Sequence, residues 1–242
     1  MPRLLEICVD SPEGFAAAIA GGADRIELCS SLALGGLTPS AGLIALAARA
    51  PVPVLAMIRP RAGGFDWSGE EVEAMETEIA AVSRAGLAGV VIGATRGDRL
   101  DLAVLDRLIG AAKGLDLTLH RCVDLLPDAL SAVDAAAERG ISRILSSGGA
   151  LTALEGITRL HAMQDHAAGR VTIMPGSGVS ASTLPALLTG LDPAEVHASA
   201  SRPAPAGGEI ARLGFQPEGA KRTDAATVAG LKRLLTEYDA RG

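Results

Sequence analysis

The strongest constraint on the fold is a strict alternation of two kinds of segment along almost the whole chain. Short apolar runs rich in β-branched residues predict strands, and the Ala- and Leu-rich amphipathic segments between them predict helices. We predict strands at residues 4–9, 24–29, 52–58, 89–92, 116–121, 142–146, 170–174 and 195–198. The predicted helices cover residues 12–20, 39–48, 69–85, 102–113, 127–139, 153–167, 181–188 and 224–239.

Eight strand–helix units in 242 residues have the size and count of a single (β/α)8 TIM barrel, a fold of the α/β class. An open, doubly wound parallel sheet is the alternative. It is disfavoured because residues 9–14 read VDSPEG, where a dinucleotide-binding domain carries Gly-x-Gly-x-x-Gly after its first strand. We therefore expect one domain over residues 1–242.

One segment departs from the alternation. Residues 199–222 read SASRPAPAGGEIARLGFQPEGAKR, rich in Gly, Pro and Ala and without clear periodicity. We expect a loop here, between the eighth strand and the last helix, that emerges at the C-terminal face of the barrel. Long loops in compact domains are functional lids or disordered segments.

Composition and the apolar runs of the sequence disfavour nucleic acid and membranes as binding partners. The net charge of -6, with three lysines and one Trp, disfavours nucleic-acid binding. No apolar run approaches the roughly 18 residues that span a bilayer. The N-terminus enters strand-like sequence directly, without a leader pattern, so we expect a cytoplasmic protein. Three cysteines predict reduced thiols and no disulfide framework.

The inward faces of the predicted strands are strongly polar near their C-terminal ends, where barrel active sites lie. In residues 4–9 the inward set includes Glu6, and in residues 24–29 it includes Arg25 and Glu27. The inward groups suited to catalysis or ligand binding are Glu6, Glu27, Arg59, His120 and His197. We expect Glu6 and Glu27 to pair with Arg59 or with a ligand, because an unpaired buried charge costs several kcal/mol. The alternative is a purely structural set of ion pairs.

Two glycine-rich turns predict an anion site. One follows the sixth strand and the other the seventh, where backbone N–H groups can approach an anion at a helix N-terminus. A second arginine close to Arg59 suggests a complementary clamp. The predicted anion-binding residues are Arg61, Ser147, Gly148, Gly176, Ser177 and Gly178. Glycines in such turns also serve simply to reverse the chain, so this alternative stays open.

Two of the three cysteines, Cys8 and Cys29, share the inward face of adjacent predicted strands. Such a thiol pair could hold a soft ion such as Cu(I), with support from His120 or Cys122. The alternative is that both are small buried hydrophobic side chains. None of the three lysines lies in a predicted strand, which disfavours Schiff-base chemistry. No cofactor other than Cu(I) is indicated.

Seven further motifs occur in a fixed order: LLEICVDS, GADRIELCSSLALGGLTPS, IRPRAGGF, LHRCVD, RILSSGG, MPGSGV and EVHASA. Together they run from Leu4 to about Ser199 and resemble the motifs of the CutC family of copper-homeostasis proteins. The resemblance implies a single (β/α)8 barrel, a cytoplasmic location and a homo-oligomer, most often a dimer. It also implies a Cu(I) role for Cys8 and Cys29.

Two functions follow from these features. The first is copper homeostasis, with Cu(I) bound by the two cysteines at the barrel mouth. The second is an enzyme of unassigned reaction that acts on a small anionic, including a phosphorylated, metabolite. In the second, the Arg and Gly-rich turns would hold the anion while the carboxylates and histidines would handle protons.

Overall fold

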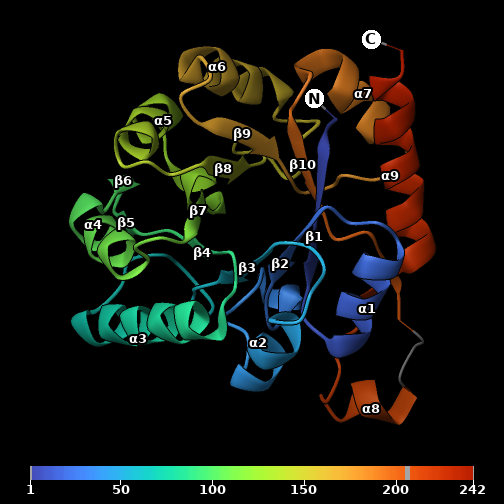
Figure 1. Cartoon of the computed structure of the whole chain (residues 1–242), viewed down its shortest axis with the longest axis horizontal. Helices are drawn as coiled ribbons and strands as arrows, with labels where there is room; N and C mark the ends of the chain where they lie inside the picture. Colours follow the sequence, from blue (N-terminus) through green and yellow to red (C-terminus); the bar gives the residue numbers. More distant parts are fainter. Residues whose placement is uncertain (1, 205–207, 242) are drawn as a thin grey trace.

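The protein is described by a computed structural model in which residues 2–204 and 208–241 are placed. Eight parallel strands form a nearly closed barrel in the order β10-β1-β2-β3-β4-β7-β8-β9 (Figure 1). Strands β9 and β10, at the two ends of this order, lie side by side. The predicted (β/α)8 barrel is confirmed. The barrel strands are β1 (Leu4–Val9), β2 (Arg25–Leu28), β3 (Val54–Met57), β4 (Gly89–Ile92), β7 (Asp116–Leu119), β8 (Arg143–Ser146), β9 (Thr172–Pro175) and β10 (Glu195–Ala198).

Helices surround the barrel in Figure 1, and most begin at a side-chain cap. Ser11 caps the first helix, and Ser68 forms a capping box with Glu71 at the start of the third. The second helix begins at Ala41 behind a Ser40 cap, two residues later than the predicted start, because the Thr38 hydroxyl instead accepts the Arg59 N–H. The surrounding helices are α1 (Pro12–Ala20), α2 (Ala41–Ala47), α3 (Gly69–Ala85), α4 (Leu102–Ala111), α5 (Ala129–Glu138), α6 (Ile157–Ala167), α7 (Leu184–Leu191) and α9 (Ala225–Asp239).

The apolar core divides into two parts. The larger part lies between the sheet and the helices and takes the outward side chains of the strands, among them Leu5, Ile7 and Ile26. A small second cluster inside the barrel contains Cys29 and Met57 with Leu55 and Val91. The outward and inward sets predicted for residues 4–9 and 24–29 are therefore correct. Other interior positions hold polar groups together with Met174, whose Sδ lies 3.3 Å from the Arg25 guanidinium.

Short elements decorate the loops. Two-residue strands β5 (Thr95–Arg96) and β6 (Arg99–Leu100) pair after β4, and the 3-10 helices η1 (Leu32–Leu34) and η2 (Arg121–Leu125) follow β2 and β7. None of the helices described for residues 2–204 and 208–241 is long and apolar enough to cross a membrane.

The segment predicted as a loop over residues 199–222 is more ordered than its composition suggests. It holds an antiparallel ribbon of β11 (Ser201–Pro203) and β12 (Lys221–Thr223), with the short helix α8 (Gly208–Arg212) between the two strands. The Arg202 guanidinium pairs with Asp224, the cap of α9, at 2.8 Å. Residues 205–207 of the predicted loop lie outside the described residues.

Candidate functional site

A cavity of about 500 Å³ opens at the C-terminal ends of the barrel strands. Its walls come from β1, β2, β10 and the loops after β3, β7 and β9. Seven of the predicted site residues line it: Cys8, Glu27, Arg59, His120, Ser177, Gly178 and His197. The polar inward side chains predicted from the sequence therefore meet at this end of the barrel. It is the end at which the active sites of barrel enzymes lie.

Below the cavity lies a layer of charged side chains that we call the inner ion network, made of Glu6, Arg25, Arg143 and Glu195. Arg25 forms ion pairs with both Glu6 and Glu195. Arg143 pairs with Glu195 at 3.0 Å and with Asp116 at 2.7 Å. Every member has an opposite charge beside it, which compensates the cost of burying it.

The expected pairing with Arg59 is wrong for both Glu6 and Glu27, since the hydrogen bonds of the Arg59 guanidinium in the described residues go to backbone carbonyl oxygens. In the parallel ladder, Glu6 lies opposite Arg25, so the guanidinium on the neighbouring strand reaches its carboxylate first. Arg59 follows the end of β3 and lies at the mouth instead. The sequence placed Arg25 on the inward face but gave no sign of the strand register that makes it the partner of Glu6.

His197 joins the inner ion network to the cavity. Its Nδ1 lies 2.8 Å from Glu6 Oε1, and its Nε2 lies 3.8 Å from Glu27 Oε2. Burial lowers the pKa of His197, but the Cys8 thiol and the carboxylates of Glu27 and Glu6 outweigh it and raise the pKa well above its usual value. Burial also raises the pKa of Glu6, yet hydrogen bonding to His197 and the Arg25 charge lower it to about 2. We therefore expect an imidazolium held by an ionised carboxylate at neutral pH.

Glu27 is buried and only half satisfied. Burial raises the pKa of its carboxyl group; the nearby His197 opposes this rise and Glu6 adds to it. Oxygen Oε2 accepts a hydrogen bond from Cys29 Sγ at 3.5 Å. Oxygen Oε1 is buried and has no partner in the described part of the chain. Burying a carboxylate oxygen without a hydrogen-bond donor costs free energy. Such an unpaired oxygen in a cavity wall indicates a position where a ligand would supply the donor.

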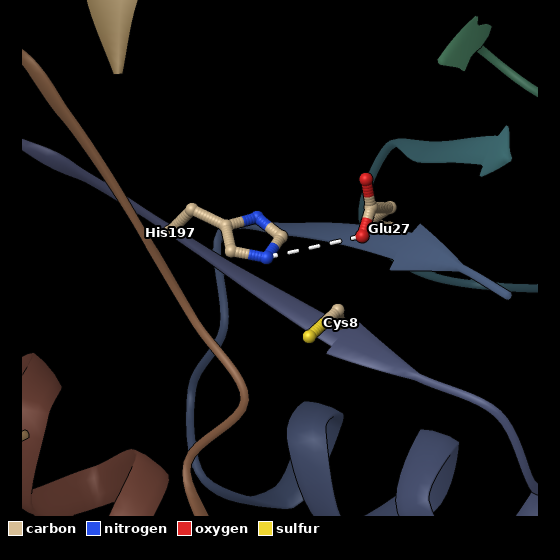
Figure 2. Close-up of side chains that lie close together, drawn as sticks. All are labelled: Cys8, Glu27 and His197. Carbon is tan, nitrogen blue, oxygen red and sulfur yellow. Dashed lines mark ion pairs between the residues drawn. The ribbon is translucent and has the colours of Figure 1, made fainter. Parts of the chain in front are cut away.

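Figure 2 shows three of these side chains pointing toward one another from different strands: Cys8 on β1, Glu27 on β2 and His197 on β10. One potential ligand atom from each lies within 4.8 Å of the other two. Cys29 lies outside this compact group, and burial together with Glu27 and Cys8 raises the pKa of its thiol well above the usual value. The predicted supporting thiol, Cys122, is buried in the outer apolar core.

Arg59 is a buried cation that faces the cavity. Its guanidinium donates to the carbonyl oxygens of Leu34 at 2.8 Å, Gly36 at 3.0 Å and Gly63 at 2.9 Å. Its Nε has no partner, and no carboxylate of the described residues pairs with it. The second predicted clamp residue, Arg61, is 43% exposed, pairs with Glu71 and lies outside the cavity wall.

His120 presents a single fixed tautomer to the cavity. Its Nδ1 accepts the backbone N–H of Cys122 at 3.2 Å, which leaves the proton of the neutral ring on Nε2. Burial and the Arg59 charge lower the pKa of His120 to about 3, so the ring is neutral at physiological pH. The buried Nε2 has no partner among the described residues. Sequence reasoning found this residue but not its tautomer.

The two glycine-rich turns differ in whether their backbone N–H groups already have acceptors within the protein. In the turn after β8, the N–H groups of Ser147 and Gly149 donate to the Asp124 carboxylate at 3.1 Å, and Gly148 N–H donates to Ser146 Oγ. The Asp124 carboxylate of the protein itself thus occupies the predicted anion site. Its presence in the LHRCVD motif was the sequence signal for this arrangement.

In the turn after β9, Ser177 and Gly178 line the cavity with positive φ angles of 76° and 69°. The N–H groups of these two residues donate to no acceptor in the described ranges. The third predicted residue, Gly176, donates its N–H to the carbonyl oxygen of Ser146 at 2.9 Å. This turn therefore keeps free donors for a ligand, unlike the turn after β8.

Comparison with known proteins agrees with the motif resemblance. The CutC family model matches residues 3–202. A family protein CutC of Sinorhizobium medicae is 51% identical over 96% of both chains, and one of Agrobacterium fabrum is 48% identical over 98% of this chain and 96% of its own.

Solved structures give the same assignment. A CutC of Streptococcus agalactiae, assigned provisionally to copper homeostasis, is 29% identical, with a TM-score of 0.78 over 81% of this chain and 98% of its own. Phosphoribosyl anthranilate isomerase of Thermotoga maritima shares the fold alone, at 12% identity and a TM-score of 0.60 over 98% of this chain and 100% of its own. With motifs, family match, relatives and barrel in agreement, the chain belongs to the CutC family.

Proposed function

We propose that this protein binds Cu(I) at the barrel mouth and serves copper homeostasis in the cytoplasm, as a homodimer. The observation that carries the proposal is the convergence of Cys8, Glu27 and His197, whose potential ligand atoms lie within 4.8 Å of one another. The provisional assignment of the Streptococcus agalactiae relative to copper homeostasis supports the choice of metal.

The donor set suits a soft ion. Cu(I) prefers thiolate and imidazole ligands over the hard carboxylate of Glu27. Cys8 and His197 supply these ligands once the metal displaces the Cys8 Sγ proton and the Nε2 proton of the His197 imidazolium. The hydrogen bond that His197 Nδ1–H donates to Glu6 orients the ring and leaves Nε2 to face the metal, as outer partners of ligand histidines do. Cys29, whose thiol donates to Glu27 Oε2 at 3.5 Å, is the second sulfur that the proposal assigns.

An anaerobic competition titration against a Cu(I) chelator tests this proposal. We expect Cys8→Ser to lower the Cu(I) affinity by at least about tenfold, since loss of a ligand costs no less than loss of an outer partner. Cys122→Ala is the matched control, because this thiol lies in the outer core. Unchanged affinity in the double variant Cys8→Ser with Cys29→Ser contradicts the proposal.

A second function, an enzyme acting on a small anion, is favoured by a different observation. Arg59 is buried beside the cavity without a carboxylate partner, and the nearby atoms Glu27 Oε1 and His120 Nε2 are buried and unpaired. One bound anion with further polar groups would satisfy all three. This set exceeds what a two- or three-coordinate metal ion requires.

Thermal shift with inorganic phosphate, acetate and phosphate esters tests the second function. The Tm should rise with at least one of these anions, and Arg59→Ala should abolish the rise while it leaves the fold intact. Arg107→Ala, which removes an exposed pair with Glu76 at 2.8 Å, is the control. If no anion produces a shift that depends on Arg59, this second function is excluded.

The proposed dimer and location are testable separately. Large apolar side chains are exposed on loops at the C-terminal end of the barrel, with Leu125 67% and Leu151 85% exposed, and a partner subunit would cover them. Analytical ultracentrifugation gives the oligomeric state, and cell fractionation gives the location.

A further inference from the structure

We infer that the barrel mouth moves a proton on the carbon next to the carbonyl group of a small organic anion. In this assignment the Nε2–H of His120 holds the carbonyl oxygen and Glu27 Oε1 takes the proton. The inference rests on the second function proposed above, the binding of a small anion at Arg59, and it names the chemistry for that site.

The first argument is the fixed donor. Because the backbone N–H of Cys122 occupies Nδ1 of His120, the ring can only present N–H at Nε2. The side chain is 3% exposed, and the Phe65 ring lies against it at 4.7 Å, so the ring cannot turn freely. A neutral N–H that keeps its proton stabilises developing negative charge on oxygen and needs no rearrangement during reaction. Its natural partner is a carbonyl oxygen.

The second argument is the acceptor. Glu27 is 3% exposed, and its Oε2 is held by the Cys29 thiol and lies 3.8 Å from His197 Nε2. These contacts leave Oε1 as the one oxygen of this carboxylate without a partner in the described part of the chain. Glu27 and His120 line the same cavity, so a ligand held there can meet both a fixed donor and a fixed acceptor.

The third argument is the anionic end of the ligand. The Arg59 guanidinium lies over the Phe65 ring at 5.1 Å, and the same ring contacts His120, so cation and neutral donor share one wall. Ser177 and Gly178, whose N–H groups have no acceptor in the described ranges, line the same cavity. Carboxylate and phosphate groups both satisfy such donors. The ligand class is therefore a small carboxylate or phosphate ester that carries a carbonyl.

The step balances without a co-reactant. Glu27 Oε1 accepts the proton from the carbon beside the carbonyl, and the C–H electron pair becomes the carbon–carbon π bond. The carbonyl π electrons move to oxygen, where the N–H of His120 stabilises the negative charge. The proton, exchanged with solvent on Glu27, returns to the same carbon while the oxyanion electrons restore the carbonyl, which gives hydrogen exchange at that carbon.

Exchange with solvent tests the inference directly. The full-length protein is incubated in D2O with pyruvate in one arm and dihydroxyacetone phosphate in the other, and loss of the C–H signal is followed by ¹H NMR. The first arm reports a carboxylate ligand and the second a phosphate ester. We expect exchange at least about a hundredfold above buffer in one arm, the lower end of the range of general-base catalysis, and a fall to the buffer rate in Glu27→Gln.

Variants at His120 separate a catalytic from a structural effect. His120→Phe keeps a ring against Phe65 but removes the donor, whereas His120→Gln restores an N–H. We expect the exchange rate to be lost in the first and partly regained in the second, with Arg107→Ala unchanged. A ¹⁵N spectrum of the wild-type ring should show the neutral Nε2–H tautomer, and this measurement needs no folded variant.

Four results overturn the inference. They are the absence of exchange in both arms with the wild type, exchange that survives Glu27→Gln, equal rates in the two His120 variants, and an Nδ1–H or charged His120 ring. A thermal shift that depends on Arg59 together with absent exchange refutes only this chemistry. The absence of any shift that depends on Arg59 refutes the anion site itself.

Discussion

The inner ion network and the barrel mouth are built from neighbouring positions of the same strands, yet they treat charge in opposite ways. In the network, Arg25 and Arg143 meet Glu6, Glu195 and Asp116, so each charge is compensated within the protein. At the mouth, the described residues leave buried polar atoms without partners. Arginine and glutamate side chains thus form structural ion pairs in the inner layer, whereas at the mouth they are available to a ligand. The sequence left open whether the inward charges were structural ion pairs or a ligand site, and the structure contains both arrangements in different layers.

The largest expected effect comes from breaking the compensated layer. Arg25→Ala leaves the carboxylates of Glu6 and Glu195 buried without their shared partner, and we expect a loss of about 3–5 kcal/mol in the free energy of unfolding. Urea denaturation measures it. Arg59→Ala is the matched comparison, since it removes a buried cation that has no carboxylate partner. A cost for Arg59→Ala as large as that for Arg25→Ala would remove the distinction between the layers.

A second prediction sharpens the comparison at the two glycine-rich turns. Asp124 accepts N–H groups from Ser147 and Gly149, so Asp124→Ala should cost about 2–3 kcal/mol, as expected for hydrogen bonds to a charged group. Urea denaturation again gives the value. Ser177→Ala should cost less, because the Ser177 hydroxyl donates only to the Leu151 carbonyl oxygen, at 2.7 Å. Equal costs would mean that both turns are structural.

A third prediction concerns pH and the residue that links the layers. The pKa of His197 is raised in the folded state, so the folded protein binds more protons than the unfolded chain above pH 6.5. The stability that His197 contributes is complete below that pH and is lost as the pH rises toward the folded pKa. For one group the slope is at most about 1.4 kcal/mol per pH unit.

Urea denaturation between pH 6 and 9 tests this slope. His197→Gln should flatten it, while His161→Gln, on an exposed histidine of α6, should leave it unchanged.

Glu6 makes stability depend on pH in the acid range. Because its pKa is lowered to about 2, its contribution is present above pH 4.5 and is lost as the pH falls toward 2. For His197, a wild-type free energy of unfolding that stays constant between pH 6 and 9 would contradict a raised pKa in the folded state.

The sequence allowed the barrel, its outward and inward faces and most of the mouth to be predicted, because alternation and periodicity are local signals. Cys8, Glu27, His120 and His197 all reach the cavity for this reason. The pairing of Glu6 with Arg25 depends on the register between two strands, which no local pattern encodes.

Two further properties depend on loop geometry. The tautomer of His120 is set by the backbone of η2, and the Asp124 carboxylate closes a turn that is distant in sequence. Arg61 resembled Arg59 in the sequence, but Glu71, at the start of α3, draws it away from the cavity.

This contrast between two arginines gives the smallest expected effect. Arg61 stacks over Trp67 at 4.7 Å and pairs with Glu71 at the surface, where water and salt screen the charges. Arg61→Ala should therefore change the urea midpoint by less than the measurement resolves and leave any anion-induced rise in Tm intact. Arg59→Ala should abolish that rise. If the two variants reduce anion binding equally, the two arginines act as the clamp that their spacing suggested, and the mouth extends beyond the cavity described for it.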